Sequence, residues 1–242
     1  MRHLFPLFLI LIALSCDKSE QNKATVDLNF QASIGASDYS FSDYFTNGDG
    51  IKIRIEVLQF YIADVRFVDK KGEETSVADI ALVKCINGNG SMSMQVPAGN
   101  YTSVKFAIGV PDEMNQAGPS AYTEADHPLS STQNTYWGMN SMYRFLMIDG
   151  KYDLTGDGID EGGFSYHTGF NDCYREIELE HDFSFDKKGV HTENISIDLS
   201  KIFYSSGSMV DVTSESNFHG DYSQIDLAIR LSNNFAAALS VQ

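Results

Sequence analysis

Apolar and polar residues alternate with a period of two along most of the chain. The alternating runs are rich in Val, Ile, Phe and Tyr, which favour a pleated strand with one buried face. They lie at 25–31, 52–59, 60–68, 80–85, 91–96, 102–108, 143–149, 163–168, 176–185, 194–199 and 221–231. Turn sequences such as Asn47-Gly48-Asp49-Gly50 separate them. Because no long segment has a helical period, the pattern predicts an all-β fold, a single antiparallel β-sandwich.

Two kinds of segment depart from this pattern. Residues 111–135 form a long polar stretch without a strand, and residues 199–208 and 235–239 have the spacing of short helical turns. In a compact domain, a loop of that length is usually functional or an insertion. We therefore expect a β-sandwich with a long loop insertion before Trp137.

The first residues have the features of an export signal. An apolar run from Leu4 to Leu14 is shorter than the roughly 20 residues that a spanning helix needs. It ends at Ala13-Leu14-Ser15-Cys16, which is similar to a bacterial lipobox with an acylated cysteine. An ordinary cleaved secretory peptide, in which Cys16 is incidental, is the alternative.

The lipobox interpretation divides the chain into three segments. We expect a lipoprotein signal peptide at 1–15, an acylated cysteine and tether at 16–24, and one sandwich domain at 25–242. The protein would be exported and lipid-anchored to a bacterial envelope membrane, where it faces the periplasm or the cell surface.

Acidic residues outnumber basic ones by 33 to 17, which gives a net charge of −16. Such a chain repels nucleic acid and anionic membrane surfaces. We therefore expect no nucleic-acid partner, and membrane contact through the lipid anchor only. Beyond the signal, Cys85 and Cys173 form a possible disulfide in an oxidising envelope, with free or metal-bound thiols as the alternative.

Residues 153–161 resemble the start of an EF-type calcium loop. Oxygen-bearing side chains occupy positions one, three and five, and glycine follows at position six. The glutamate of the twelfth position is absent, so a later acidic residue would complete the site. The candidate calcium ligands are Asp153, Thr155, Asp157, Asp160 and Glu161. A solvated acidic hairpin is the alternative.

Trp137 is the only tryptophan of the chain, and Met139 and Met142 follow it closely. Thioethers and an indole suit a soft metal such as Cu(I), or oxidation of the protein itself. Packing in the core is the alternative, because Met and aromatic side chains fill sandwich interiors well. No nucleophile elbow, phosphate-binding glycine loop or clustered histidine spacing accompanies them, so we expect no enzymatic activity.

An ordered series of motifs is similar to the MbnP-like family, exported β-sandwich proteins associated with methanobactin and copper loci. The resemblance covers residues 26–231. The motifs are Tyr44-Phe45-Thr46-Asn47 through Gly50, Val57-Leu58-Gln59-Phe60-Tyr61-Ile62-Ala63-Asp64-Val65-Arg66-Phe67, Val96-Pro97-Ala98-Gly99-Asn100-Tyr101, Phe106-Ala107-Ile108-Gly109-Val110, His127-Pro128-Leu129-Ser130, Tyr136-Trp137, Tyr143-Arg144-Phe145 and Tyr166-His167.

The resemblance implies a copper site. Trp137 would correspond to the tryptophan that a partner di-haem c-type peroxidase oxidises in some members, and His167 would be a copper ligand. The first-strand histidine of copper-binding members is missing from Phe30-Gln31-Ala32, so Met139, Met142 or His127 would complete the coordination. Alternatively, this branch has kept the sandwich and lost the metal.

A second interpretation places the protein in a different functional class. It would be a non-catalytic binding or scaffold lipoprotein of the envelope, possibly stabilised by calcium. The long loop and its flank supply aromatic side chains for a glycan or protein ligand, namely Tyr122, Tyr136 and Tyr143.

Overall fold

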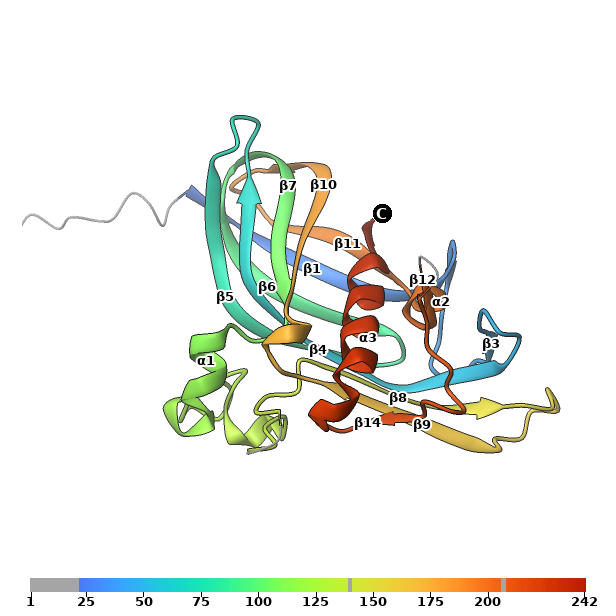
Figure 1. Cartoon of the computed structure of the whole chain (residues 1–242). Coiled ribbons are helices and arrows are strands. Elements are labelled where there is room, and N and C mark those ends of the chain that lie inside the picture. Colours follow the sequence, from blue (N-terminus) through green and yellow to red (C-terminus); the bar gives the residue numbers. More distant parts are fainter. Residues whose placement is uncertain (1–21, 139–140, 206–207) are drawn as a thin grey trace, which may run out of the picture.

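The computed structural model describes residues 22–138, 141–205 and 208–242. In these residues the chain forms the two β-sheets of a sandwich and a separate two-stranded ribbon, with helix α3 (Ile225–Ala237) at one open side of the sandwich (Figure 1). The predicted all-β sandwich is confirmed. The predicted signal peptide and Cys16 lie outside the described residues.

The smaller sheet has the order β15-β11-β1-β2, and β6 also pairs with β1. Alternate residues of β1, such as Leu28 and Phe30, are fully buried, as a period of two requires. β1 and β11 run parallel, unlike the predicted antiparallel pairing, because the chain enters β11 from the other sheet and not through a hairpin. The bounds are β1 (Lys23–Ile34), β2 (Ser37–Asp38), β6 (Asn89–Pro97), β11 (Val190–Asp198) and β15 (Leu239–Val241).

The larger sheet has the order β10-β7-β4-β8-β9-β14, with β3 and β5 also paired to β4. β4 is one strand of 17 residues where two strands were predicted. It pairs with β5 along one edge and with β8 and β7 along the other. The bounds are β3 (Phe45–Thr46), β4 (Lys52–Val68), β5 (Glu74–Cys85), β7 (Gly99–Ile108), β8 (Leu146–Asp153), β9 (Gly162–Thr168), β10 (Arg175–Phe185) and β14 (Asn217–Phe218). A separate ribbon consists of β12 (Tyr204–Ser205) and β13 (Ser208–Met209).

Helix α3 replaces most of the strand predicted at 221–231. Alternate apolar residues suggested a strand there, but Leu227, Leu231 and Phe235 also recur every four residues and form one buried helical face. This face packs into the core, where the Phe235 ring lies 5.0 Å from that of Phe60. The helical turn predicted at 199–208 is present in part as α2 (Leu199–Phe203). No helix of the described residues is both long and apolar enough to cross a membrane.

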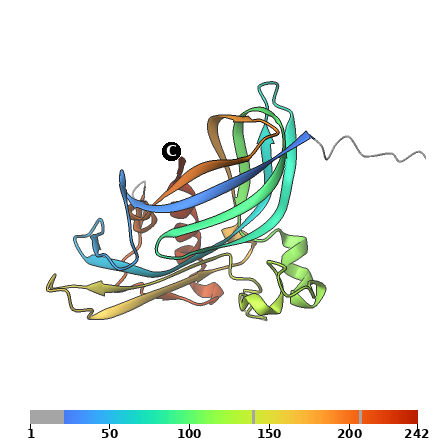
Figure 2. The same ribbon diagram turned by 180° about the vertical axis from the view of Figure 1, so that it is seen from behind.

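The long loop insertion is structured by short helices. It contains α1 (Asp112–Ala117) and the 3-10 turns η2 (Pro119–Ala121) and η3 (Ser131–Gln133). Figure 2 shows it as a lobe at one end of the larger sheet. The buried Asn115 accepts a hydrogen bond from Tyr143 N–H at 3.0 Å, and the Tyr61 hydroxyl donates to the Pro128 carbonyl at 2.8 Å. These bonds fix the lobe to the sheet.

The two described cysteines are free thiols. Cys85 ends β5, whereas Cys173 lies in the 3-10 turn η4 (Asn171–Cys173) before β10. β4 and β7 separate β5 from β10, which is three strand spacings or about 14 Å. Because a disulfide needs Cα atoms within about 7 Å, the predicted disulfide is not formed. Burial raises the pKa of Cys85 to about 12 and that of Cys173 to about 11, so both thiols stay protonated.

Candidate metal centre

Strands β8 and β9 place three polar side chains together on the outer face of the larger sheet. Tyr166 is fully buried in the core, so its neighbours Ser165 and His167 project to the opposite face. Asp149 of β8 is the Cα partner of Ser165 across the ladder. The alternation of β9 therefore presents a hydroxyl and an imidazole beside a carboxylate.

The segment after the long loop carries Trp137 onto this face. Tyr136 and Tyr143 form an isolated antiparallel bridge, and Trp137 N–H donates to the Met142 carbonyl at 2.8 Å. Gly138 permits the turn with a left-handed φ of 63°. The indole centroid lies 5.2 Å from the His167 ring. The structure thus brings Trp137 and His167 into one cluster.

His219 completes the cluster and was not predicted from the sequence. It follows β14, whose Phe218 is the parallel partner of Tyr166. Its ring stacks on that of His167 at 4.9 Å and lies 5.5 Å from the Trp137 ring. The signal that could have revealed it is the repeated aromatic-histidine pair, Tyr166-His167 and Phe218-His219, in which each buried aromatic sends the next residue outward.

A hydrogen-bond network orients both imidazoles through Nε2. His167 Nε2 lies 2.9 Å from Asp149 Oδ1, and the Ser165 hydroxyl donates to the same oxygen at 2.6 Å. Because that hydroxyl has no second hydrogen, it accepts from His219 Nε2 at 2.8 Å. We infer from these partners that both rings carry their proton on Nε2. Both Nδ1 atoms then carry lone pairs.

The groups around the two rings lower the pKa of Asp149 and of His219. Burial opposes ionisation of Asp149, but hydrogen bonds from His167 and Ser165 outweigh it and hold the pKa of this carboxyl below its usual value. Desolvation lowers the pKa of His219, and the charge of Asp149 opposes this effect while that of Arg144 adds to it. An ionised carboxylate beside neutral imidazoles is the usual outer shell of a histidine metal site.

Arg144 covers one face of the indole. Its Cζ lies 4.8 Å from the Trp137 ring centroid, within the range of a cation–π contact. The guanidinium also donates to the carbonyls of Thr135 and Asn134. Trp137 is therefore held between a cation and two imidazoles.

The described residues provide two nitrogen ligands for a copper ion, Nδ1 of His167 and Nδ1 of His219. His167 Nδ1 is buried, and no donor of the described residues reaches it. An orphaned lone pair of this kind is rare unless something else occupies its partner position. The described part of the chain brings no third histidine, thiolate or carboxylate within ligand distance of both rings, so it provides no closed tetrahedral zinc site. Imidazole nitrogens suit copper.

The other predicted copper ligands have different positions. His127 lies in the long loop, where its Nδ1 accepts from Leu129 N–H and its ring stacks on Tyr122 at 4.5 Å. It is a loop-stabilising residue and not part of the Trp137 cluster. Met142 flanks the turn, and Met139 lies outside the described residues. Met147, which was not predicted, is the Cα partner of His167, and its sulfur accepts from Gln59 at 3.3 Å.

The loop tyrosines do not form a stacking surface for a ligand. Tyr143 is fully buried and donates to the Leu129 carbonyl, and Tyr136 packs edge-on against it at 4.9 Å. Tyr122 is covered by His127. A separate cleft of about 630 Å³ lies where β1, β5 and β6 meet the long loop. Its lining includes the carboxamides Asn29, Gln31, Asn89, Gln133 and Asn194.

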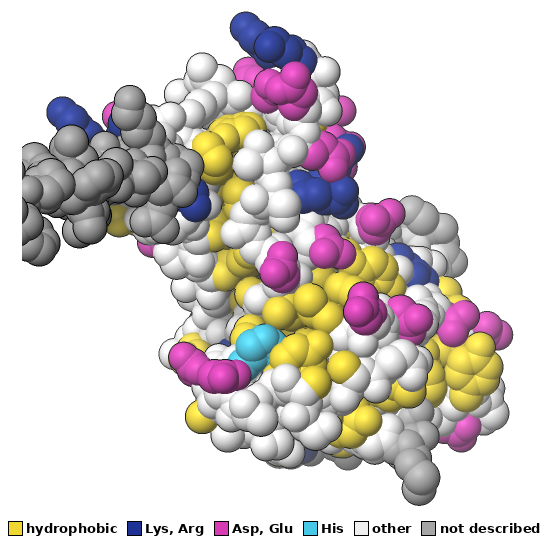
Figure 3. Space-filling view, turned by 90° about the vertical axis from the view of Figure 1, so that its left-hand side faces the viewer, with side chains coloured by type: hydrophobic (Ala, Val, Ile, Leu, Met, Phe, Trp, Pro, Cys, Tyr) yellow, Lys and Arg dark blue, Asp and Glu magenta, His cyan; other side chains and the backbone are white. Residues whose placement is uncertain are grey.

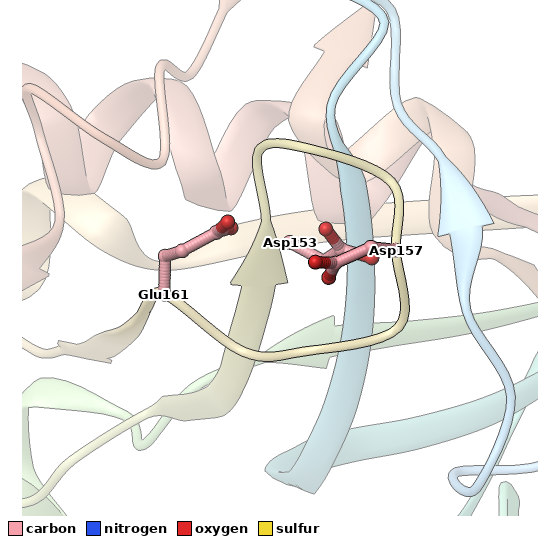
Figure 4. Close-up of side chains that lie close together, drawn as sticks. All are labelled: Asp153, Asp157 and Glu161. Carbon is pink, nitrogen blue, oxygen red and sulfur yellow. The ribbon is translucent and has the colours of Figure 1, made fainter.

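The predicted calcium loop converges on three carboxylates. Oxygens of Asp153, Asp157 and Glu161 lie within 4.8 Å of one another, and Figure 4 shows them extending into one loop. Asp153 is buried, and its oxygens accept from Gly156 and Gly158 N–H at 2.6 and 2.8 Å. Asp160, in contrast, pairs with Arg54 and Tyr44 and is excluded from the group. Calcium binding stays a prediction.

Comparisons with known proteins identify the family and the fold. The profile of the MbnP family matches residues 23–221. Among solved structures, MbnP from Methylosinus trichosporium is similar with a TM-score of 0.54 and 15% identity, over 83% of this chain and 82% of that one. At this identity the likeness shows the fold alone. A search of curated proteins finds no match. Since the family profile covers most of its length, the chain belongs to the MbnP family.

Proposed function

We propose that the protein binds a copper ion as Cu(I) through Nδ1 of His167 and of His219, beside Trp137. The observation that carries this proposal is the paired orientation of the imidazoles. Asp149 and Ser165 engage both Nε2 atoms, so both Nδ1 atoms are left as donors. Two neutral nitrogens are too few for a closed zinc site and suit copper.

A Cu(I) competition titration tests the ligands. His167→Ala and His219→Ala should each weaken binding by at least about 100-fold, which exceeds the usual effect of an outer-shell change. His181→Ala is the matched control, because His181 is an exposed residue of β10. Equal affinities in the wild type and both cluster variants would remove the copper site.

Trp137 is proposed to be oxidised by a partner di-haem c-type peroxidase, as family membership suggests. The indole is only partly buried, which leaves it within reach of an oxidant. The intact mass of the protein purified from its own cells should differ from the sequence mass after allowance for acylation. In Trp137→Phe that difference should vanish. An unmodified Trp137 in the native protein would contradict this part of the proposal.

A second candidate function is the binding of an uncharged glycan in the cleft between β1, β5, β6 and the long loop. The five carboxamides favour it, because each can donate to and accept from sugar hydroxyls. Envelope oligosaccharides should then bind the wild type and bind Asn29→Leu at least about tenfold more weakly, as for other lost polar contacts. No heat of binding for the wild type in calorimetry would eliminate this function.

A further inference from the structure

Arg144 is buried in a position that packing alone does not explain. The residue is 7% exposed, and its guanidinium lies against the face of Trp137. The ion pairs of the described residues do not include it. A buried cation without a carboxylate partner is costly, because it loses hydration without an opposite charge in return.

The hydrogen bonds of Arg144 leave its charge uncompensated at close range. Its acceptors are the carbonyls of Thr135 and Asn134, which carry no net charge. The acidic group of the cluster, Asp149, is engaged by His167 and Ser165. Arg144 therefore places a positive charge against the indole that only the longer-range field of Asp149 offsets.

The cluster has a simple charge balance. Asp149 contributes one negative charge and Arg144 one positive charge, while imidazoles that bind a metal are neutral, as the indole is. The described groups around the two Nδ1 atoms therefore carry no net charge. Without Arg144 they would carry one negative charge, which attracts a divalent ion more strongly than a monovalent one.

We infer that Arg144 is a specificity-determining residue of the proposed copper site, where its fixed positive charge disfavours divalent ions relative to a monovalent ion. The inference rests on the proposed function. Coulomb repulsion scales with the charge of the ion, so Arg144 opposes Zn²⁺ twice as strongly as Cu⁺. Arg144 Cζ lies 4.8 Å from the indole centroid, which lies 5.2 Å from the His167 ring, so the guanidinium is within about 10 Å of that ring. At an effective permittivity near 20, each unit of ion charge then corresponds to at least about tenfold in affinity.

Two variants separate the charge of Arg144 from its packing. Arg144→Met removes the charge and keeps an apolar stem against the indole, and Arg144→Lys keeps the charge and loses the planar stack. Arg66→Met is the control for net charge, because Arg66 pairs with Glu74 on the surface. Arg144→Gln replaces the methionine variant if thermal unfolding or the fluorescence of Trp137 shows that it is misfolded.

The measurement is a competition titration with Cu⁺ and with Zn²⁺ on full-length protein purified from its own cells and freed of metal. In Arg144→Met the affinity for Zn²⁺ should increase about tenfold more than that for Cu⁺, whereas Arg144→Lys and Arg66→Met should keep the wild-type ratio. Equal changes for both ions, or a lysine variant that behaves like the methionine variant, overturn the inference.

The same titration distinguishes this inference from the proposed function. If the wild type and His167→Ala bind Cu⁺ with the same weak affinity, the copper site and the inference both fail. If His167→Ala loses affinity but the Zn²⁺ to Cu⁺ ratio of Arg144→Met is unchanged, only the role of Arg144 fails.

Discussion

At the residue scale, the cluster depends on one carboxylate that contacts no proposed ligand atom. Asp149 Oδ1 accepts from His167 Nε2 and from the Ser165 hydroxyl, which in turn accepts from His219. One oxygen therefore sets the orientation of both rings. Such outer-shell groups fix the tautomer of a ligand histidine and raise its basicity.

Asp149→Asn should weaken Cu(I) binding by about 10-fold to 100-fold. The amide keeps an acceptor but loses the negative charge that strengthens the hydrogen bond from His167. Competition titration measures the effect, with Asp182→Asn on β10 as a control of equal charge. An affinity equal to that of the wild type would show that the network does not tune the site.

At the element scale, His219 depends on the turn at residues 211–215, which precedes β14 and forms an ion pair with α3. Asp211 accepts from Thr213 N–H at 2.9 Å and from the hydroxyls of Thr213 and Ser214. Glu215 of the same turn pairs with Arg230 of α3. The turn leads directly into β14, so it holds the histidine over β9.

The stability supplied by Asp211 should depend on pH. Hydrogen bonds from Ser214 and Thr213 hold the pKa of its carboxyl well below the unfolded value of about 3.9. The contribution is therefore present above about pH 4 and is lost as the pH falls through the folded pKa. Asp211→Ala should lose about 1 kcal/mol of unfolding free energy at neutral pH. In urea unfolding, a difference from wild type that stays constant down to about pH 2 would contradict this assignment.

Calcium should raise the melting temperature of the wild type by mass action once its concentration exceeds the dissociation constant. Asp157→Asn should abolish the increase, because Asp157 belongs to the carboxylate group of the loop. Asp160→Asn is a control from the same loop. This variant should keep the calcium-dependent increase in melting temperature, because Asp160 is paired with Arg54. Equal melting temperatures of the wild type in EDTA and in excess calcium would show that the loop is an acidic hairpin without a calcium site.

At the scale of the whole molecule, the described chain starts at β1, at the end of the sandwich away from β9 and β14 (Figure 1). Acidic side chains are distributed over the face that carries β5 and α1 (Figure 3). The formal charge of −16 favours the approach of cations.

Cys16→Ser should release the protein from the membrane fraction. Acylation of this cysteine is the expected anchor, and serine offers no thiol for it. Detergent partition of cell fractions measures the change, and Cys85→Ser is the matched control because that thiol belongs to β5 of the folded domain. A Cys16→Ser protein that still fractionates with membranes would place the anchor elsewhere.

The sequence by itself determined the features that depend on local pattern. The strands follow from alternation with a period of two, because each strand buries every second side chain. The convergence of Asp153 and Asp157 follows from their spacing on one turn. Trp137 was identifiable because it is unique in the chain and follows the long loop.

The tertiary structure decided which distant residues share a site. His219 is 54 positions from Ser165, and only the parallel pairing of β14 with β9 brings its ring onto His167. The secondary structure of residues 221–231 was ambiguous in the sequence, because their apolar residues satisfy both a strand and a helical period. In the fold most of them form a helix, whose apolar face is buried at the open side of the sandwich. The Trp137 cluster therefore depends on strand order in the larger sheet, which local alternation does not encode.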